Sequence, residues 1–205
     1  MKANHLEFLV EEPSMEAFLR ALLPRLLPDG HSFDVHPFNG KDDLLGKLES
    51  RLRGYARWLP PDWRIVVVVD RDDDDCTVLK GQLEGIARRA GLRSRTEAGS
   101  PSWQIVNRIA IEELEAWYFG DWAAVQAAYP GVKPTLPRQR KYRDPDAITG
   151  GTWEAFERVL QKHRYYPTGL PKVEAARTLG AHIDPSRTRS KSFEVFCHAV
   201  LEATR

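Results

Sequence analysis

The feature that most constrains the fold is the run "RIVVVVD" at residues 64–70, where four consecutive valines leave both faces of a strand apolar. Successive side chains of a strand point to opposite faces of the sheet, so this strand needs cover on both sides. Such continuous apolar runs are typical of parallel sheets that carry helices on both faces. The valines therefore predict a central strand of a parallel α/β sheet.

Three further short runs predict strands at residues 6–11, 33–38 and 103–111. The segments between them carry apolar residues at helical spacing, and strands that alternate with helices are joined by right-handed crossovers. Pro37 lacks an amide donor, which suits an edge strand. The pattern predicts an α/β domain over residues 1–131, with a mainly parallel four-stranded sheet.

The rest of the chain, residues 132–205, has a different character. Residues 132–151 are rich in Pro, Arg, Lys and Gly and predict a loop or linker. Three helices are predicted after it, at residues 153–163, 171–180 and 192–204. We expect a helical C-terminal subdomain that docks on the sheet domain.

Charge divides the chain in the same place. Lysines and arginines number 16 against 21 aspartates and glutamates through Val132, and 14 against 8 from Lys133 onward. An acidic front and a basic back suit a metal centre beside a surface that binds a polyanion. The alternative is a scatter of solvated charges.

The sequence also predicts a cytoplasmic protein without a membrane segment. No apolar run is long enough for a membrane span, and Glu7, Glu11 and Glu16 interrupt any signal-peptide core. Cys76 and Cys197 stand alone, without metal-type spacing, which suits a reducing compartment.

Acidic residues follow three of the predicted strands. Glu11 ends the first strand, Asp70 and Asp72 end the third, and Glu112 follows the fourth with Glu115 close behind. Ligands bind outside the carboxyl ends of the strands in open parallel sheets, so these carboxylates are expected at one edge. An all-oxygen set of this kind suits Mg²⁺ or Mn²⁺.

The stretches "FLVEEPSMEAFL" and "VVVVDRDDDD" resemble the Toprim domain of topoisomerases, primases and overcoming-lysogenization-type nucleases. "IEELEAWYFGD" and "SFEVFCHAVL" also resemble an uncharacterised bacterial Toprim-like family, often encoded beside ATPases in defence loci. The resemblance implies a Toprim-like sandwich in which Glu11 matches the family's glutamate. Asp70 and Asp72 match its Asp-x-Asp pair. Glu12 departs from the pattern, because the family usually has glycine there.

The resemblance implies a Mg²⁺-dependent nuclease that acts on DNA or RNA, as the effector of an ATPase-associated anti-phage defence system. The partner would be an AAA-type or ABC-type ATPase subunit. Glu11, Asp70 and Asp72 would hold one or two ions for hydrolysis, and Glu11 is the first candidate to accept a proton from water.

Two other functions remain open. In a receiver domain Asp70 would accept a phosphoryl group, although no strand-end lysine after a fifth strand is evident. In a catalytically inactive Toprim-like scaffold the chain would only bind its partner, and Glu12 favours that alternative.

Candidate contacts to nucleic acid come from basic residues. Lys41 precedes a predicted helix near the same sheet edge, where it either reaches a phosphate or is simply solvated. The densest basic cluster consists of Arg138, Arg140, Lys141 and Arg143, which either track a phosphate backbone or form a disordered loop.

Overall fold

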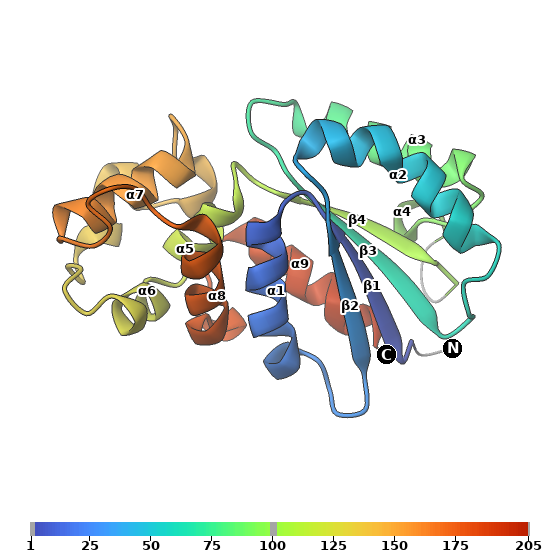
Figure 1. Ribbon diagram of the computed structural model, residues 1–205, viewed down its shortest axis with the longest axis horizontal. Coiled ribbons are helices and arrows are strands. Elements are labelled where there is room, and N and C mark those ends of the chain that lie inside the picture. The colour runs from blue at the N-terminus through green and yellow to red at the C-terminus, as the bar shows by residue number, and fades with distance from the viewer. Residues whose placement is uncertain (1–2, 99–101, 205) are drawn as a thin grey trace.

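The protein is described here by a computed structural model of residues 3–98 and 102–204. One sheet of four parallel strands forms its centre, in the order β2-β1-β3-β4 (Figure 1). The strands are β1 (His5–Val10), β2 (Ser32–Pro37), β3 (Trp63–Asp70) and β4 (Ile105–Ala110). The predicted four-stranded parallel α/β sheet is confirmed, with β2 at an edge.

The valine run occupies β3, between β1 and β4. Val66 and Val68 pack into one hydrophobic cluster, whereas Val67 and Val69 pack into another on the opposite face. All four valines are fully buried, as strand alternation requires when both faces are covered.

Helices cover the two faces unequally. One face carries α2 (Lys41–Ala56) and α3 (Cys76–Arg89), with the short α4 (Arg95–Ala98) beside them. The other face carries α1 (Pro13–Leu26) and α9 (Lys191–Ala203), and α8 (Lys172–His182) packs against α1 (Figure 1). Gly91 follows α3 with φ +82°, a left-handed conformation that glycine adopts without strain at a helix end.

The chain after β4 is helical. It forms α5 (Leu114–Gly120), α6 (Trp122–Ala128) and α7 (Thr152–Lys162), and reaches α8 and α9 through further turns. The predicted linker contains three 3₁₀ helices: η1 (Leu136–Arg138), η2 (Arg140–Tyr142) and η3 (Pro145–Ala147). A fourth, η4 (Pro185–Arg187), precedes α9. Helices were correctly predicted at residues 153–163, 171–180 and 192–204.

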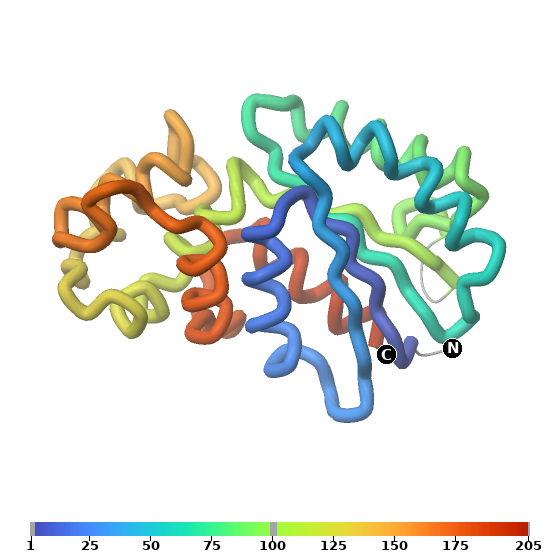
Figure 2. Tube along the Cα trace, in the orientation of Figure 1, coloured from blue at the N-terminus to red at the C-terminus, as the bar shows by residue number. Residues whose placement is uncertain are grey.

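The C-terminal helices share a core with the sheet. Phe196 of α9 lies 6.4 Å from Phe8 of β1, measured between ring centroids, and both belong to one cluster that runs from Ala3 to Ala203. The Ala3 amide donates a hydrogen bond to the Ala203 carbonyl, so the two described ends lie side by side (Figure 2). The division into residues 1–131 and 132–205 stays a prediction, but the two parts are not packed as independent cores.

No helix among residues 3–98 and 102–204 combines the length and the apolar character that crossing a membrane requires.

Candidate metal and phosphate site

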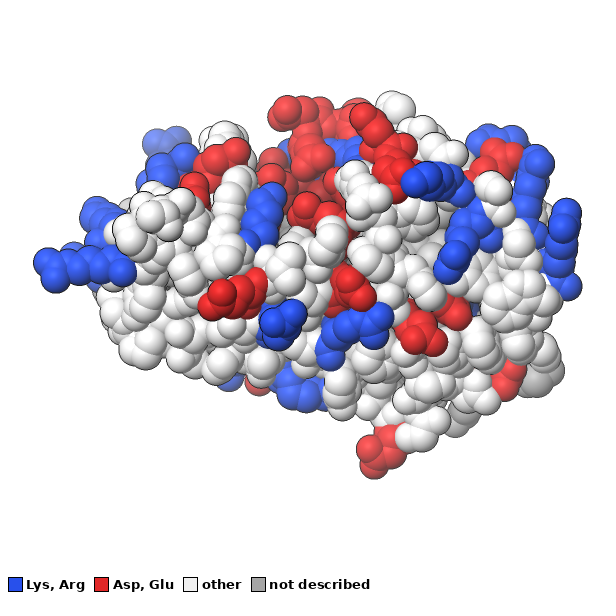
Figure 3. Space-filling view, viewed as in Figure 1, with Lys and Arg blue, Asp and Glu red and all other residues white. Residues whose placement is uncertain are grey.

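Glu11 and Asp70 meet where β1 and β3 end. Val10 of β1 pairs with Val68 of β3 in parallel register, which brings the residues after both strands to the same rim of the sheet. The Asp70 amide donates a hydrogen bond of 3.0 Å to Glu11 Oε2. Figure 3 shows acidic side chains gathered on this rim, with basic side chains to either side.

Asp70 is an unusually placed acid. It is only 6% exposed, and its Oδ1 has no hydrogen-bond partner among the described residues. Burial, reinforced by the charges of Glu11, Glu115 and Glu12, holds the pKa of the Asp70 carboxyl well above its ordinary value. Burial also raises the pKa of Glu11 to about 7, against the opposing effect of its hydrogen bond from Asp70. The folded chain therefore holds two crowded carboxyl groups that resist ionisation.

Glu115, from the first turn of α5, adds a third buried acid. It is 3% exposed, and burial raises its pKa to about 8 although the charge of Lys172 opposes the shift. The Tyr118 hydroxyl is also buried and has no hydrogen-bond partner in the described structure. Burial raises the pKa of Tyr118 most, and the charges of Glu115 and Asp70 raise it further. The three groups therefore lie in one region.

Lys172 brings a positive charge to these acids from the first residue of α8. Burial lowers its pKa, but the charges of Glu12, Glu115 and Glu113 outweigh burial and raise it. Its Nζ lies 4.5 Å from the Trp153 ring centroid, in cation–π range. Lys172 could not be predicted from the sequence, because only the packing of α8 against α1 brings it to the rim.

Asp72 is held by Lys41 and by its own backbone. Lys41 Nζ lies 2.8 Å from both Asp72 Oδ2 and Asp74 Oδ2, and it donates a hydrogen bond to the Arg71 carbonyl. Asp72 has φ +49°, and its amide donates to the Glu112 carbonyl. Lys41 is thus a counterion that orients the loop after β3, a role that neither sequence interpretation had assigned to it.

The remaining predicted acids have structural partners. Glu112 forms an ion pair with Arg71, and Glu12 Oε1 accepts a hydrogen bond from the Ser14 hydroxyl. Asp75 caps α3 by accepting hydrogen bonds from the Thr77 and Val78 amides.

Glu113 connects the rim to the C-terminal helices. Its Oε2 accepts hydrogen bonds of 2.8 Å from the Thr152 hydroxyl and from the Trp153 amide, at the start of α7. The segment between β4 and α5 therefore both anchors the start of α7 and leads into Glu115.

The donor set fits a hard divalent cation. Glu11, Asp70, Asp72 and Glu115 offer only oxygen, and Asp70 Oδ1 is a buried oxygen without a partner. Within the described ranges, the one group of three metal-ligating side chains whose ligand atoms all lie within 4.8 Å of one another is elsewhere, at His5, Glu7 and Asp34. The ligand atoms of the rim acids are thus not gathered within that distance in the described structure.

The basic cluster Arg138, Arg140, Lys141 and Arg143 lies in η1 and η2 and just after them. Its side chains are exposed, while Tyr142 between them is buried and packs against Phe119 with ring centroids 5.0 Å apart. The cluster is therefore displayed on an anchored segment, and the disordered-loop alternative does not describe it.

Comparison with known proteins gives one match. The family model described as a domain of unknown function (DUF4276) matches residues 10–201, and that description assigns no activity. No curated protein and no solved structure matches the chain. Because the matched range covers most of the chain, from the end of β1 through the acidic rim and into α9, the chain belongs to the DUF4276 family.

Proposed function

We propose that this protein is a Mg²⁺-dependent hydrolase of nucleic-acid phosphodiester bonds. The observation that carries the proposal is the buried Asp70 carboxyl, whose Oδ1 lacks a partner beside Glu11 at the carboxyl ends of parallel strands. A buried acid surrounded by further acids is costly to ionise, and a bound cation would offset that cost. The resemblance of Glu11, Asp70 and Asp72 to the Toprim pattern supports the same conclusion.

Each side chain of the rim has a role in this proposal. Glu11, Asp70 and Asp72 would hold Mg²⁺ or Mn²⁺, and Glu115 lies behind them as a buried fourth acid. A bound divalent ion supplies positive charge for the scissile phosphate and lowers the pKa of water. Glu11 is the first candidate to accept a proton from water, as the resemblance implies.

Basic residues complete the proposed substrate surface. Lys172 presents its ammonium group beside the acids, where it would bind a phosphate oxygen. Arg138, Arg140, Lys141 and Arg143 would contact the backbone of DNA or RNA further along. An AAA-type or ABC-type ATPase partner and a cytoplasmic defence role follow from the resemblance alone.

The low exposure of Asp70 argues against a receiver domain. A phospho-acceptor carboxylate must attack a phosphodonor directly, whereas Asp70 is 6% exposed. The sheet of the described residues also has four strands, without the fifth strand that positions the receiver lysine.

The test is a cleavage assay with the full chain, with and without an ATPase encoded beside its gene. Single-stranded and double-stranded DNA and RNA are incubated with Mg²⁺, with Mn²⁺ or with EDTA. We expect ion-dependent cleavage that Asp72→Asn abolishes. Asparagine tolerates the left-handed backbone of residue 72, so this variant removes charge without adding backbone strain. Asp73→Asn, an exposed neighbour, is the matched control and should cleave normally.

The outcomes separate the three functions. Cleavage by Asp72→Asn at the wild-type rate would contradict the proposed site. Phosphate acquired by Asp70 from acetyl phosphate would indicate a receiver. Absence of cleavage under every condition, with partner binding retained, would indicate a scaffold.

A further inference from the structure

A second polar cluster lies at the opposite end of β1, on the face of the sheet that α2 covers. Glu7 of β1 pairs in register with Asp34 of β2, and His5 is two residues before Glu7 on the same face. His5 Nε2 lies 3.4 Å from Glu7 Oε1 and 3.9 Å from Asp34 Oδ2. Glu7 and Glu11 are four residues apart along an extended strand, about 13 Å, so this cluster is separate from the acidic rim.

His5 is buried and its Nε2 points into this cluster without a hydrogen bond. The residue is 6% exposed, and Nε2 has no hydrogen-bond partner among the described residues. His5 Nδ1 lies 2.7 Å from the Ser32 hydroxyl oxygen, while that hydroxyl is directed toward the Asn4 carbonyl. When the Ser32 hydroxyl donates to the Asn4 carbonyl it accepts from Nδ1, and Nε2 then carries the lone pair that binds metals.

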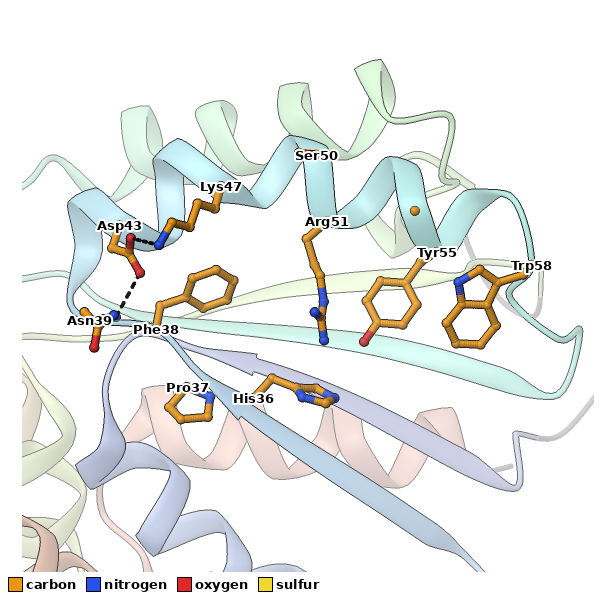
Figure 4. A pocket seen from close by; sticks show the side chains of 11 residues that line it. His36, Pro37, Phe38, Asn39, Asp43, Lys47, Ser50, Arg51, Tyr55 and Trp58 are labelled. Carbon is orange, nitrogen blue, oxygen red and sulfur yellow. Dashed lines mark hydrogen bonds and ion pairs between the residues drawn. The ribbon is translucent and has the colours of Figure 1, made fainter.

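Glu7 is oriented from its other side. Its Oε2 accepts a hydrogen bond of 3.0 Å from the Tyr55 hydroxyl and lies 2.7 Å from His36 Nε2. Both partners line an open groove of about 840 Å³ between β2 and α2 (Figure 4). With Oε2 fixed in this way, Oε1 is the oxygen that faces His5. Such outer partners are what orients a metal-binding carboxylate.

We propose that His5 Nε2, Glu7 Oε1 and an Asp34 carboxylate oxygen form a site for a borderline divalent transition ion such as Zn²⁺. Three ligand atoms of mixed nitrogen and oxygen character, with one position open, are typical of zinc sites that keep a water or bind a ligand. In a tetrahedral zinc site ligand atoms are roughly 3.3 Å apart, close to the spacing of His5 and Glu7. The imidazole ligand favours Zn²⁺ over Mg²⁺.

The site is built to admit an ion from solvent. The Asp34 side chain is 59% exposed, whereas those of His5 and Glu7 are 8% and 6% exposed. The His5 ring is fixed against Trp63, with ring centroids 3.8 Å apart. Two buried ligands on the same face of β1 and one exposed ligand leave the ion a route from solvent.

The Asp70→Asn protein is used, because this substitution weakens the acidic rim as a competing site. It is titrated first with Co²⁺, which absorbs visible light when bound, and then with Zn²⁺. We expect one Co²⁺ to bind per chain, with the absorption bands that Co²⁺ shows at low coordination number. Zn²⁺ should remove these bands, and excess Mg²⁺ should not. Asp34→Asn should weaken Zn²⁺ binding at least tenfold. The exposed Asp29→Asn is its matched control and should bind like the parent.

A histidine pair gives the second arm. His5→Gln should abolish the Co²⁺ bands, and His31→Gln, which alters a histidine outside the cluster, should preserve them. If His5→Gln fails to fold, Asp34→Asn decides, because the Asp34 side chain is 59% exposed and asparagine keeps its size. Zn²⁺ binding that is unchanged in Asp34→Asn, or no binding at micromolar Zn²⁺, would overturn the proposal.

Discussion

The Asp70 amide donates its hydrogen bond to Glu11 Oε2 at 3.0 Å, while the Asp70 carboxyl is buried and lacks a partner for Oδ1. One residue thus fixes a neighbouring acid through its backbone and repels it through its side chain. The hydrogen bond gives the rim a defined geometry, and the repulsion makes that geometry sensitive to cations and to pH.

Asp70→Asn should remove most of the repulsion. In EDTA at pH 8 the variant should melt at a higher temperature than wild type. Wild type should gain about 2.7 kcal/mol when Mg²⁺ is at a hundredfold excess over its Kd, which is roughly 5–11 °C for a chain of this size. Asp70→Asn should lose most of that gain in calorimetric melts. An equal Mg²⁺ response in Asp70→Asn and in the control Asp73→Asn would contradict the assigned site.

Stability without divalent ions should fall as pH rises. The pKa of Glu115 is about 8 in the folded protein against 4.5 ordinarily, with Lys172, Glu113, Glu12 and Asp70 as its charged neighbours. Between about pH 4.5 and 8 the folded state therefore keeps a proton that the unfolded chain releases. The contribution of Glu115 to the free energy of unfolding is complete below about pH 4.5 and is lost as pH rises to about 8. Melts in EDTA at pH 5 and pH 8 test this, and Glu115→Gln should flatten the dependence.

We expect nucleic-acid binding and its salt dependence to weaken when the four residues of the basic cluster are replaced by glutamine (Arg138, Arg140, Lys141 and Arg143). For duplex DNA each lost phosphate contact lowers the slope of log K against log salt by about 0.9. Binding is measured by fluorescence anisotropy at several salt concentrations. A charge-matched variant of exposed residues on α2, at its C-cap and on α3 (Lys47, Arg53, Arg57 and Arg88) should bind like wild type. Equal losses in both variants would indicate a general charge effect.

Glu113→Ala should loosen α7. It removes the acceptor of the Thr152 hydroxyl and the Trp153 amide, at a cost of about 1–2 kcal/mol. The expected readouts are a lower melting temperature and faster hydrogen exchange in α7. Glu113→Gln keeps an acceptor oxygen and should recover most of the loss. Glu154→Ala, in the first turn of the same helix, should change little.

Gly180→Ala should destabilise the contact between α1 and α8. A Cβ at residue 180 would lie 2.4 Å from the Phe18 carbonyl oxygen, so the helices must separate. We expect a net loss of about 1–2 kcal/mol and a fall in melting temperature of roughly 2–8 °C. Gly46→Ala in α2 is the counterpart, because nothing lies within 4 Å of the added atom. It should gain about 0.5–1 kcal/mol from helix propensity. A stabilising Gly180→Ala would contradict the packing.

The strands were predictable because local signals and tertiary structure agree. The valine run required burial on both faces, and β3 lies inside the sheet. Pro37 suited an edge strand, and β2 is one of the two edge strands. The positions of Glu11 and Asp70 were predictable because ligands bind at the carboxyl ends of parallel strands, where both residues lie. Lys172 and the His5 cluster were not predictable in this way. Lys172 reaches the rim only through packing of distant helices, and His5, Glu7 and Asp34 lie on two strands whose register the sequence does not state.

The placement of α9 has a consequence for how the chain folds. Residues 191–203 cover the face of β1 that carries Phe8, and Ala203 bonds to Ala3 across nearly the whole described chain. During synthesis the sheet can therefore pair its strands long before that face is shielded from water. Closure over so great a sequence separation slows folding and leaves apolar surface open to aggregation meanwhile. A fragment ending at residue 131 should accordingly be recovered in inclusion bodies rather than as a folded domain.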